Sequence, residues 1–116
     1  MNVDKPLVSV IFRTMNSAGC VGESLAAIKQ QTYPHIEIIV VDNFSTDRTK
    51  EIAESYGATV YQVGPERAAQ SNFGATQAQG QFILISDDDM VADADYIEKA
   101  VCKCLDDGYD AIYRAV

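Results

Sequence analysis

Short apolar runs alternate with helix-like stretches along almost the whole of this 116-residue chain. Each run is rich in β-branched residues and bounded by breaks, which predicts buried strands at 7–12, 36–42, 59–63, 82–86 and 109–116. Helical spacing of apolar residues, with stops such as Pro34 and Gly57, predicts helices at 23–31, 48–57, 66–80 and 93–108. This alternation predicts a single α/β domain, 1–116, with helices on both faces of a mostly parallel sheet.

The charge balance limits the partners of such a domain. Nine Lys and Arg residues against 17 Asp and Glu residues give a net charge of -8, which argues against nucleic acid and anionic membranes. No apolar run approaches the ~18 residues of a membrane span, and the first residues lack the pattern of a secretion signal. Three cysteines without a nearby histidine are typical of free thiols in a reducing compartment, so a cytoplasmic location is expected.

Three polar segments follow predicted strands directly. They are "RTMN" at 13–16, "DNFSTD" at 42–47 and "DDD" at 87–89. Ligands of parallel α/β sheets bind beyond the carboxyl ends of the strands. Because these three segments share that rim, a binding site is favoured over three unrelated turns.

The three adjacent aspartates, Asp87, Asp88 and Asp89, indicate a cation site at this rim. Mg²⁺ and Mn²⁺ favour oxygen ligands and are typically held by one or two carboxylates together with substrate phosphates. Acids two residues apart just past a strand suit this role, since alternate side chains point the same way. The competing interpretation is a solvated acidic turn.

Several linked motifs resemble one known family. "PLVSVIFRTMN" resembles the P-x-V-S-V-I-I-P-T-Y-N opening of family 2 nucleotide-sugar glycosyltransferases. "SLAAIKQQTYPHIEIIVVDNFSTDRTKEI" is similar to that family's S-L-x-S-I-x-x-Q-T-Y-x-x-x-E-I-I-V-V-D-D-G-S-T-D-x-T, and "GPERAAQSNFGATQAQGQFILISDDDM" to its R-x-x-x-x-N-x-G-x-x-x-A-x-G-x-Y-I-x-x-L-D-x-D. The resemblance implies a Rossmann-like GT-A fold, of which this chain would be the nucleotide-binding part, truncated before the acceptor-binding half.

The resemblance also implies an activity and a site. The activity would be metal-dependent, inverting transfer of a sugar from a nucleoside-diphosphate donor, with a UDP-sugar expected, to an acceptor hydroxyl. Thr14 and Asn16 would line the nucleotide site, and Asp42 would accept the imide N–H of a uracil-like base. Arg67 would approach the diphosphate. Its place at a helix start, where the dipole mildly disfavours a cation, fits an anionic partner, and pairing with Glu66 or a neighbouring acid explains it equally well.

The acidic triplet takes the metal role in this resemblance. Asp87 and Asp89 would hold Mn²⁺ or Mg²⁺, with Asp89 the direct ligand, and Asp88 would help hold the ribose. The other role available to Asp42, capping the next helix, is disfavoured because Ser45 and Thr46 are better placed for it.

The chain departs from the family pattern at three positions. Arg13 replaces the usual Pro, Met15 replaces the usual Tyr, and Ser71 replaces an Arg that commonly precedes the Asn. The Met15 change removes an aromatic ring that could stack on the base. The other two changes move or remove a positive charge and affect which donor is bound.

The sequence leaves several alternatives open. In the resembled family the general base lies well beyond the D-x-D, so the catalytic residue is unknown and the chain alone would be an inactive fragment or a nucleotide-binding module. "DDDMV" also fits the D-x-D-x-[TV] motif of haloacid dehalogenase-type phosphatases, but that motif ends the first strand of their fold and here follows the fourth. The acceptor (glycan, lipid or protein) and a homodimer also remain open.

Overall fold

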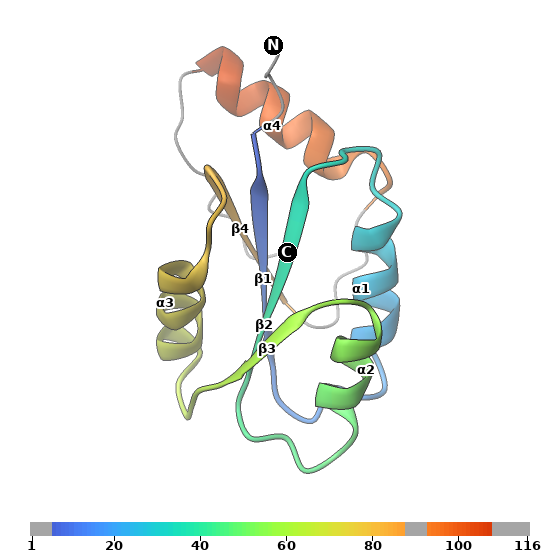
Figure 1. The fold of residues 1–116 in the computed structure, drawn as a ribbon, viewed down its shortest axis with the longest axis vertical. Helices are drawn as coiled ribbons and strands as arrows, with labels where there is room; N and C mark the ends of the chain where they lie inside the picture. Colours follow the sequence, from blue (N-terminus) through green and yellow to red (C-terminus); the bar gives the residue numbers. More distant parts are fainter. Residues whose placement is uncertain (1–5, 88–92, 108–116) are drawn as a thin grey trace.

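The computed structural model describes residues 6–87 and 93–107, with Asp87 and 103–107 described by their backbone alone. Its elements alternate as predicted (Figure 1). They are β1 (Val8–Thr14), α1 (Val21–Lys29), β2 (Ile36–Asp42), α2 (Thr49–Ser55), β3 (Thr59–Gln62), α3 (Arg67–Gln77), β4 (Phe82–Asp87) and α4 (Tyr96–Asp107). None of these described helices is long and apolar enough to cross a membrane.

The four strands form one parallel sheet in the order β3-β2-β1-β4. The central strand β1 pairs with β2 from Val8 opposite Ile36 and with β4 from Val8 opposite Phe82. All four carboxyl ends therefore point toward the same rim, which confirms the predicted parallel arrangement. The strand predicted at 109–116 lies outside the described residues.

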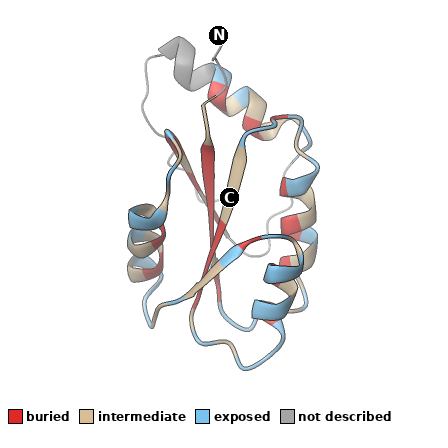
Figure 2. Cartoon of the chain, in the orientation of Figure 1, coloured by how far each residue is buried: buried red, intermediate tan, exposed pale blue. Residues whose placement is uncertain are grey.

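Helices cover both faces of the sheet, also as predicted (Figure 2). One face carries α1, α2 and α4, whose Leu25, Ala53 and Ile97 join the larger core cluster. The opposite face carries α3, which packs on a smaller cluster around Ile11 and Val41. Because successive side chains of a strand alternate between faces, both faces of the inner strands are apolar and buried.

All four predicted helices have different ends in the structure. The first begins at Val21 rather than residue 23 and ends at Lys29 rather than residue 31. The second is Thr49–Ser55 rather than 48–57, and the fourth is Tyr96–Asp107 rather than 93–108. The third ends at Gln77 rather than Gly80. Beyond Gln77 the chain leaves the helix and runs close to β1. Gly80 lies so near that an added Cβ would be 2.6 Å from Ser9 Oγ and 2.7 Å from Leu7 O. Gly57 follows the C-cap residue Tyr56 of α2 with a φ of 83°, which is the predicted C′ position.

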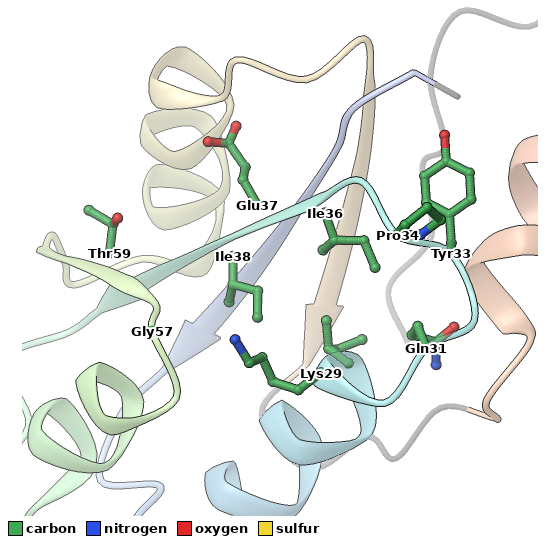
Figure 3. Close-up of a pocket in the computed structure, with 10 residues that line it drawn as sticks. Lys29, Gln31, Tyr33, Pro34, Ile36, Glu37, Ile38, Gly57 and Thr59 are labelled. Carbon is green, nitrogen blue, oxygen red and sulfur yellow. The ribbon is translucent and has the colours of Figure 1, made fainter. Parts of the chain in front are cut away.

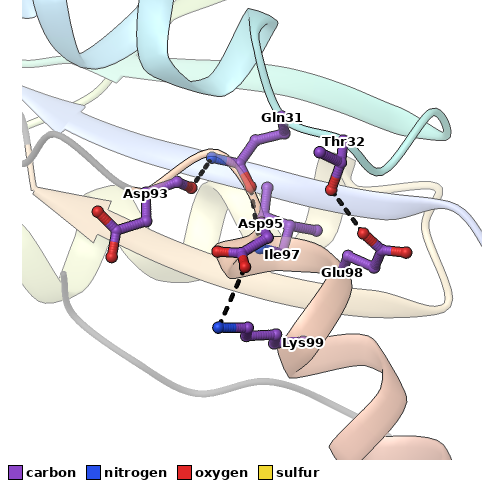
Figure 4. Close-up of polar contacts among 7 residues, drawn as sticks. All are labelled: Gln31, Thr32, Asp93, Asp95, Ile97, Glu98 and Lys99. Carbon is purple, nitrogen blue, oxygen red and sulfur yellow. Dashed lines mark hydrogen bonds and ion pairs between the residues drawn. The ribbon is translucent and has the colours of Figure 1, made fainter.

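The segment after α1 holds the start of α4 (Figure 4). Gln31 Nε2 donates to Asp93 O over 2.5 Å, and Gln31 Oε1 accepts from Ile97 N over 2.9 Å. Thr32 Oγ1 donates to Glu98 Oε1 over 2.6 Å. Because a helix leaves its first N–H groups without intrahelical acceptors, Gln31 acts as a cap supplied from another element. It thereby fixes α4 beside α1.

Candidate functional site

A small pocket of about 130 Å³ lies at the carboxyl-end rim of the sheet. It is built from the end of β1, the loops that follow β2 and β3, and the first turn of α3. Its lining residues are Arg13, Thr14, Met15, Asn43, Pro65, Arg67 and Gln70. Two residues predicted for nucleotide binding, Thr14 and Arg67, are therefore brought together here from segments more than 50 positions apart.

Gln70 fixes the first turn of α3 against the sheet. Its buried Nε2 donates to Thr14 O over 3.1 Å and to Val41 O over 2.7 Å, so one amide joins α3 to two strands. Gly74 allows the close approach, because a Cβ there would lie 2.6 Å from Ile11 Cγ2. The wall that α3 contributes to the pocket is consequently rigid.

Asp42 lies beneath the rim, fully buried. Its Oδ1 accepts hydrogen bonds from Thr14 Oγ1 over 2.6 Å and from Ser45 Oγ over 2.5 Å, and its Oδ2 accepts from Ser45 N over 2.9 Å. Both carboxylate oxygens are thus engaged in holding the loop that follows β2. The base-reading role expected of Asp42 stays a prediction, and this geometry assigns the carboxylate a supporting position.

Asn43, which the sequence reasoning did not single out, lines the pocket directly. Its backbone N–H donates to Thr14 O over 2.9 Å, and its Nδ2 donates to Pro65 O over 3.1 Å. The amide packs so closely on Gly64 that a Cβ there would lie 1.9 Å from Asn43 Oδ1. The sequence feature that could have identified Asn43 is its position directly after an apolar strand.

Arg13 and Arg67 place two guanidinium groups around one small pocket of a chain with net charge -8. Arg13 is half-buried and Arg67 is exposed. Arg13 Nη1 donates to Ser71 Oγ of α3 over 3.4 Å. Two of the three departures from the family pattern are therefore in contact. A guanidinium binds oxygen acceptors with several N–H groups at once, so the pocket suits an oxygen-rich ligand.

Asn16, also predicted to bind nucleotide, is exposed and does not line the pocket. Its backbone N–H donates to Ser45 Oγ over 2.7 Å, and its Oδ1 accepts from Thr46 N over 2.8 Å. In the structure it joins the loop after β1 to the loop after β2. Its contact with a nucleotide remains a prediction.

The N-cap residue of α2 is Arg48, and the side chain that accepts from the first helical N–H is Asp47, so the prediction that Ser45 or Thr46 would cap α2 is wrong. Asp47 Oδ1 accepts from Thr49 N over 3.0 Å and from Thr49 Oγ1 over 2.5 Å, while Oδ2 accepts from Ala18 N over 3.0 Å. The hydrogen bond from the Thr49 hydroxyl is the main cause that lowers the pKa of Asp47. Ser45 is already committed to Asp42 and Asn16, which explains the difference.

The same rim concentrates exposed apolar side chains and unusual backbone. Met15 and Phe44 are 59% and 63% exposed, the two exposed large hydrophobic residues in the described part of the chain. Phe44 has a φ of 48° and Asn16 a φ of 50°, a left-handed region that costs a bulky residue free energy. Such features are tolerated where the surroundings fix them, and here Gln62 Oε1 accepts from Phe44 N over 2.8 Å.

The acidic triplet begins at the same rim, across β1 from the pocket. Asp87 is the last residue of β4 and stands opposite Arg13 in the strand register. Asp88 and Asp89 lie outside the described residues. Within the described ranges no group of three or more His, Cys, Asp and Glu residues could hold a metal ion. Carboxylate oxygens are ligands that Mn²⁺ and Mg²⁺ prefer, so the residue types of the triplet fit such an ion.

Comparison with known proteins gives consistent matches. Residues 9–116 match the profile of the family described as Glycosyl transferase family 2. The uncharacterized glycosyltransferase RT0329 of Rickettsia typhi is 37% identical over 93 residues, which cover 77% of this chain and 29% of that protein.

Two solved structures share the fold. Staphylococcus aureus TarS 1–349 in complex with UDP-GlcNAc aligns with a TM-score of 0.78 and 31% identity, covering 86% of this chain and 31% of that chain. The mannosyltransferase PcManGT of Pyrobaculum calidifontis, in complex with GDP-Man and Mn²⁺, gives a TM-score of 0.76 and 29% identity, covering 85% and 32%. The Rossmann-like GT-A fold is thereby confirmed. The present chain spans about a third of the length of these proteins.

Proposed function

This chain belongs to glycosyl transferase family 2, and from that premise we propose that it forms the donor-binding part of a metal-dependent, inverting glycosyltransferase. The donor would be a nucleoside-diphosphate sugar, with UDP as the nucleotide, and the sugar would pass to an acceptor hydroxyl. The observation that carries the proposal is the polar pocket at the carboxyl-end rim, which combines Thr14, Asn43 and two arginines beside the start of the acidic triplet. The UDP-GlcNAc complex of TarS supports the choice of nucleotide.

Residues of the pocket would receive the nucleoside. Asn43 offers an amide to the polar edge of a base, while Met15 and Pro65 offer apolar surface to its ring. Asp42 would contribute indirectly, by holding Thr14 and the loop of Asn43 in place. This division moves the direct base contact that the sequence predicted for Asp42 to its neighbour Asn43, and a contact of Asn16 with the nucleotide stays a prediction.

Phosphates would lie toward β4. Arg67 is exposed, lines the pocket and would approach the diphosphate. Asp87 and Asp89 would hold Mn²⁺ or Mg²⁺, and Asp88 would lie near the ribose. When bound, the cation would neutralise charge that develops on the departing diphosphate. The Mn²⁺ complex of PcManGT supports this part of the proposal. Deprotonation of the acceptor requires a general base, which we assign to no residue of this chain.

Calorimetric titration of UDP into the protein tests the proposal. With Mn²⁺ present we expect binding, and in excess EDTA we expect its loss, because the acidic triplet alone repels phosphate. Asp89→Asn should abolish the metal-dependent binding, since it removes charge from a hard-cation ligand, whereas Asp88→Asn should cost much less. The melting temperature of Asp89→Asn should stay unchanged or rise, because one repulsive charge is gone.

Different results would reject different parts. Equal UDP affinity in Mn²⁺ and in EDTA would exclude the metal role. Absence of UDP binding under both conditions would reject the donor site itself. A lower melting temperature for Asp89→Asn with binding retained would indicate a structural cap.

A further inference from the structure

We propose that Arg13 is a fixed positive charge that opposes the binding of a divalent cation at the end of β4, so that the cation is taken up together with the phosphates of the nucleotide rather than alone. The inference rests on the proposed function and deepens it, because it concerns how the same site is loaded. Arg13 stands where the family usually has an uncharged Pro. The effect would therefore be a property of this chain and not of the family pattern.

Arg13 lies beside the point where the acidic triplet begins. β1 and β4 are adjacent parallel strands, and their register pairs Arg13 with Asp87, the last residue of β4. Neighbouring strands lie about 4.8 Å apart, so the backbone of Arg13 is one strand spacing away from the start of the triplet. A cation held by the acids of the triplet would consequently lie within the electric field of the Arg13 side chain.

The Arg13 side chain is held in place by α3. Its Nη1 donates to Ser71 Oγ over 3.4 Å. The helix that carries Ser71 is itself fixed to the sheet, because Gln70 Nε2 donates to Thr14 O over 3.1 Å and to Val41 O over 2.7 Å. Arg13 is half-buried, so salt screens its charge less than the charge of a fully exposed arginine. The positive charge is thus a fixed part of the rim.

The charge of Arg13 acts with opposite signs on the two ligands. A guanidinium stays protonated at any physiological pH, and it repels a divalent cation while it attracts a diphosphate. Without nucleotide, the Arg13 charge therefore offsets part of the attraction between the triplet and Mn²⁺. A bound nucleotide supplies further negative charge and further oxygen ligands through its phosphates. The cation is then held in spite of Arg13.

Titration of the protein with Mn²⁺ in the absence of nucleotide tests the inference, with the free ion measured by electron paramagnetic resonance. Arg13→Met removes the charge and keeps most of the apolar stem, and Arg13→Gln removes the charge and keeps a polar group for Ser71. Both should tighten Mn²⁺ binding about tenfold, the effect of removing a unit charge several ångströms from a divalent ion. Arg13→Lys keeps the charge and should stay within about twofold of the wild type.

Two controls locate the effect. Arg48→Ala removes the same charge from an exposed residue of the same rim that does not line the pocket. Its Mn²⁺ affinity should stay within about twofold of the wild type, because salt screens an exposed charge. Arg13→Met combined with Asp89→Asn should bind Mn²⁺ no more tightly than Asp89→Asn alone, because the tightening must occur at the triplet.

Unchanged or weaker Mn²⁺ binding by both Arg13→Met and Arg13→Gln would overturn the inference. Equal tightening by Arg48→Ala, or tightening that persists in the double variant with Asp89→Asn, would overturn it as well. These results would leave the Mn²⁺-dependent binding of UDP by the wild type intact, so they would reject the inference alone. Equal UDP affinity of the wild type in Mn²⁺ and in EDTA would reject the proposed metal role together with the inference.

Discussion

The two ends of the sheet each carry a cavity, and the nucleotide site that we propose lies at the smaller one. The amino-end cavity measures about 330 Å³ and is lined largely by the ends of α1 and α2 and the first residues of β2 and β3 (Figure 3). Its lining includes Ile28, Ile36 and Ile38. Lys29 is the one basic residue that lines it. The carboxyl-end pocket has less than half that volume but holds two arginines, an asparagine, a glutamine and a threonine.

The two cavities differ in how firmly their polar groups are placed. Glu37 borders the amino-end cavity, but its carboxylate turns to the other face of the sheet, where Ser9 Oγ and Gln79 N donate to it. At the carboxyl end, Asp42, Gln70 and Asn43 are each held by hydrogen bonds to neighbouring segments. Recognition of a ligand needs polar side chains that are already fixed in place. The arrangement of these side chains therefore indicates the binding site better than the volume of the cavity does.

The largest expected effect comes from Asp42→Ala at the carboxyl end. Removing the buried carboxylate leaves the hydroxyls of Thr14 and Ser45 and the Ser45 N–H without their acceptor. We expect the free energy of unfolding to fall by about 2–4 kcal/mol, with UDP binding lost at temperatures where the variant is still folded. Urea denaturation and calorimetry would measure the two effects.

Lys29→Ala is the counterpart at the amino end. Since Lys29 is exposed and lines only the larger cavity, UDP affinity should remain within about twofold and stability within about 0.5 kcal/mol. A strong loss of UDP affinity in Lys29→Ala would break the comparison, because the larger cavity would then be involved in nucleotide binding.

A smaller effect is expected from Gly74→Ala, which acts on the wall of the pocket. The new methyl group would lie 2.6 Å from Ile11 Cγ2 and 3.2 Å from Val41 Cγ2, so α3 must move away from the sheet. Overpacking of this kind costs about 1–3 kcal/mol, and the shift of Gln70 and Arg67 with α3 should weaken UDP binding. Thermal unfolding and titration with UDP check both expectations.

Gly22→Ala provides the matched control for that substitution. Gly22 lies in α1, and a Cβ there would meet no atom closer than 3.7 Å. Alanine should therefore be neutral or stabilise the helix by up to about 1 kcal/mol. Equal destabilisation by the two substitutions would show that the approach of α3 to the sheet has no special importance.

A pH-dependent effect concerns Asp47, whose carboxylate joins the two loops of the rim. Its pKa in the folded protein is lowered from 3.8, chiefly by the hydrogen bond from Thr49, so the unfolded chain takes up the proton first. The stabilisation by Asp47 is therefore complete above about pH 4 and is lost as the pH falls through the lowered pKa. Melting temperatures of the wild type and of Asp47→Asn should differ most at neutral pH and converge in acid. A constant difference across this range would exclude the carboxylate as its cause.

Elements with a strong local pattern were predictable, whereas their ends were not. The apolar runs of β1, β2 and β4 and the stop at Gly57 were identified from the sequence because they depend on neighbouring residues. The true end of α3 depends on Gly80 meeting the backbone of β1. At the start of α2, Asp47 accepts from Thr49 N, whereas Ser45 donates to Asp42. The end of α3 and the contacts at the start of α2 both depend on residues from distant segments. The spacing of neighbouring residues in the sequence does not predict such contacts.

The sequence by itself determined the α/β fold, the parallel sheet and the rim at which a ligand would bind, because alternating apolar periodicity dictates burial and the carboxyl ends of parallel strands must coincide. The resemblance to the family also implied that Thr14 and Arg67 belong to the nucleotide site. Only the tertiary structure decided which side chains face the pocket. It buried Asp42 under three hydrogen bonds, turned Asn43 toward Pro65, and brought Arg13 against Ser71. These outcomes depend on contacts between β1, α3 and two loops, and such contacts exist only after the helices have packed on the sheet.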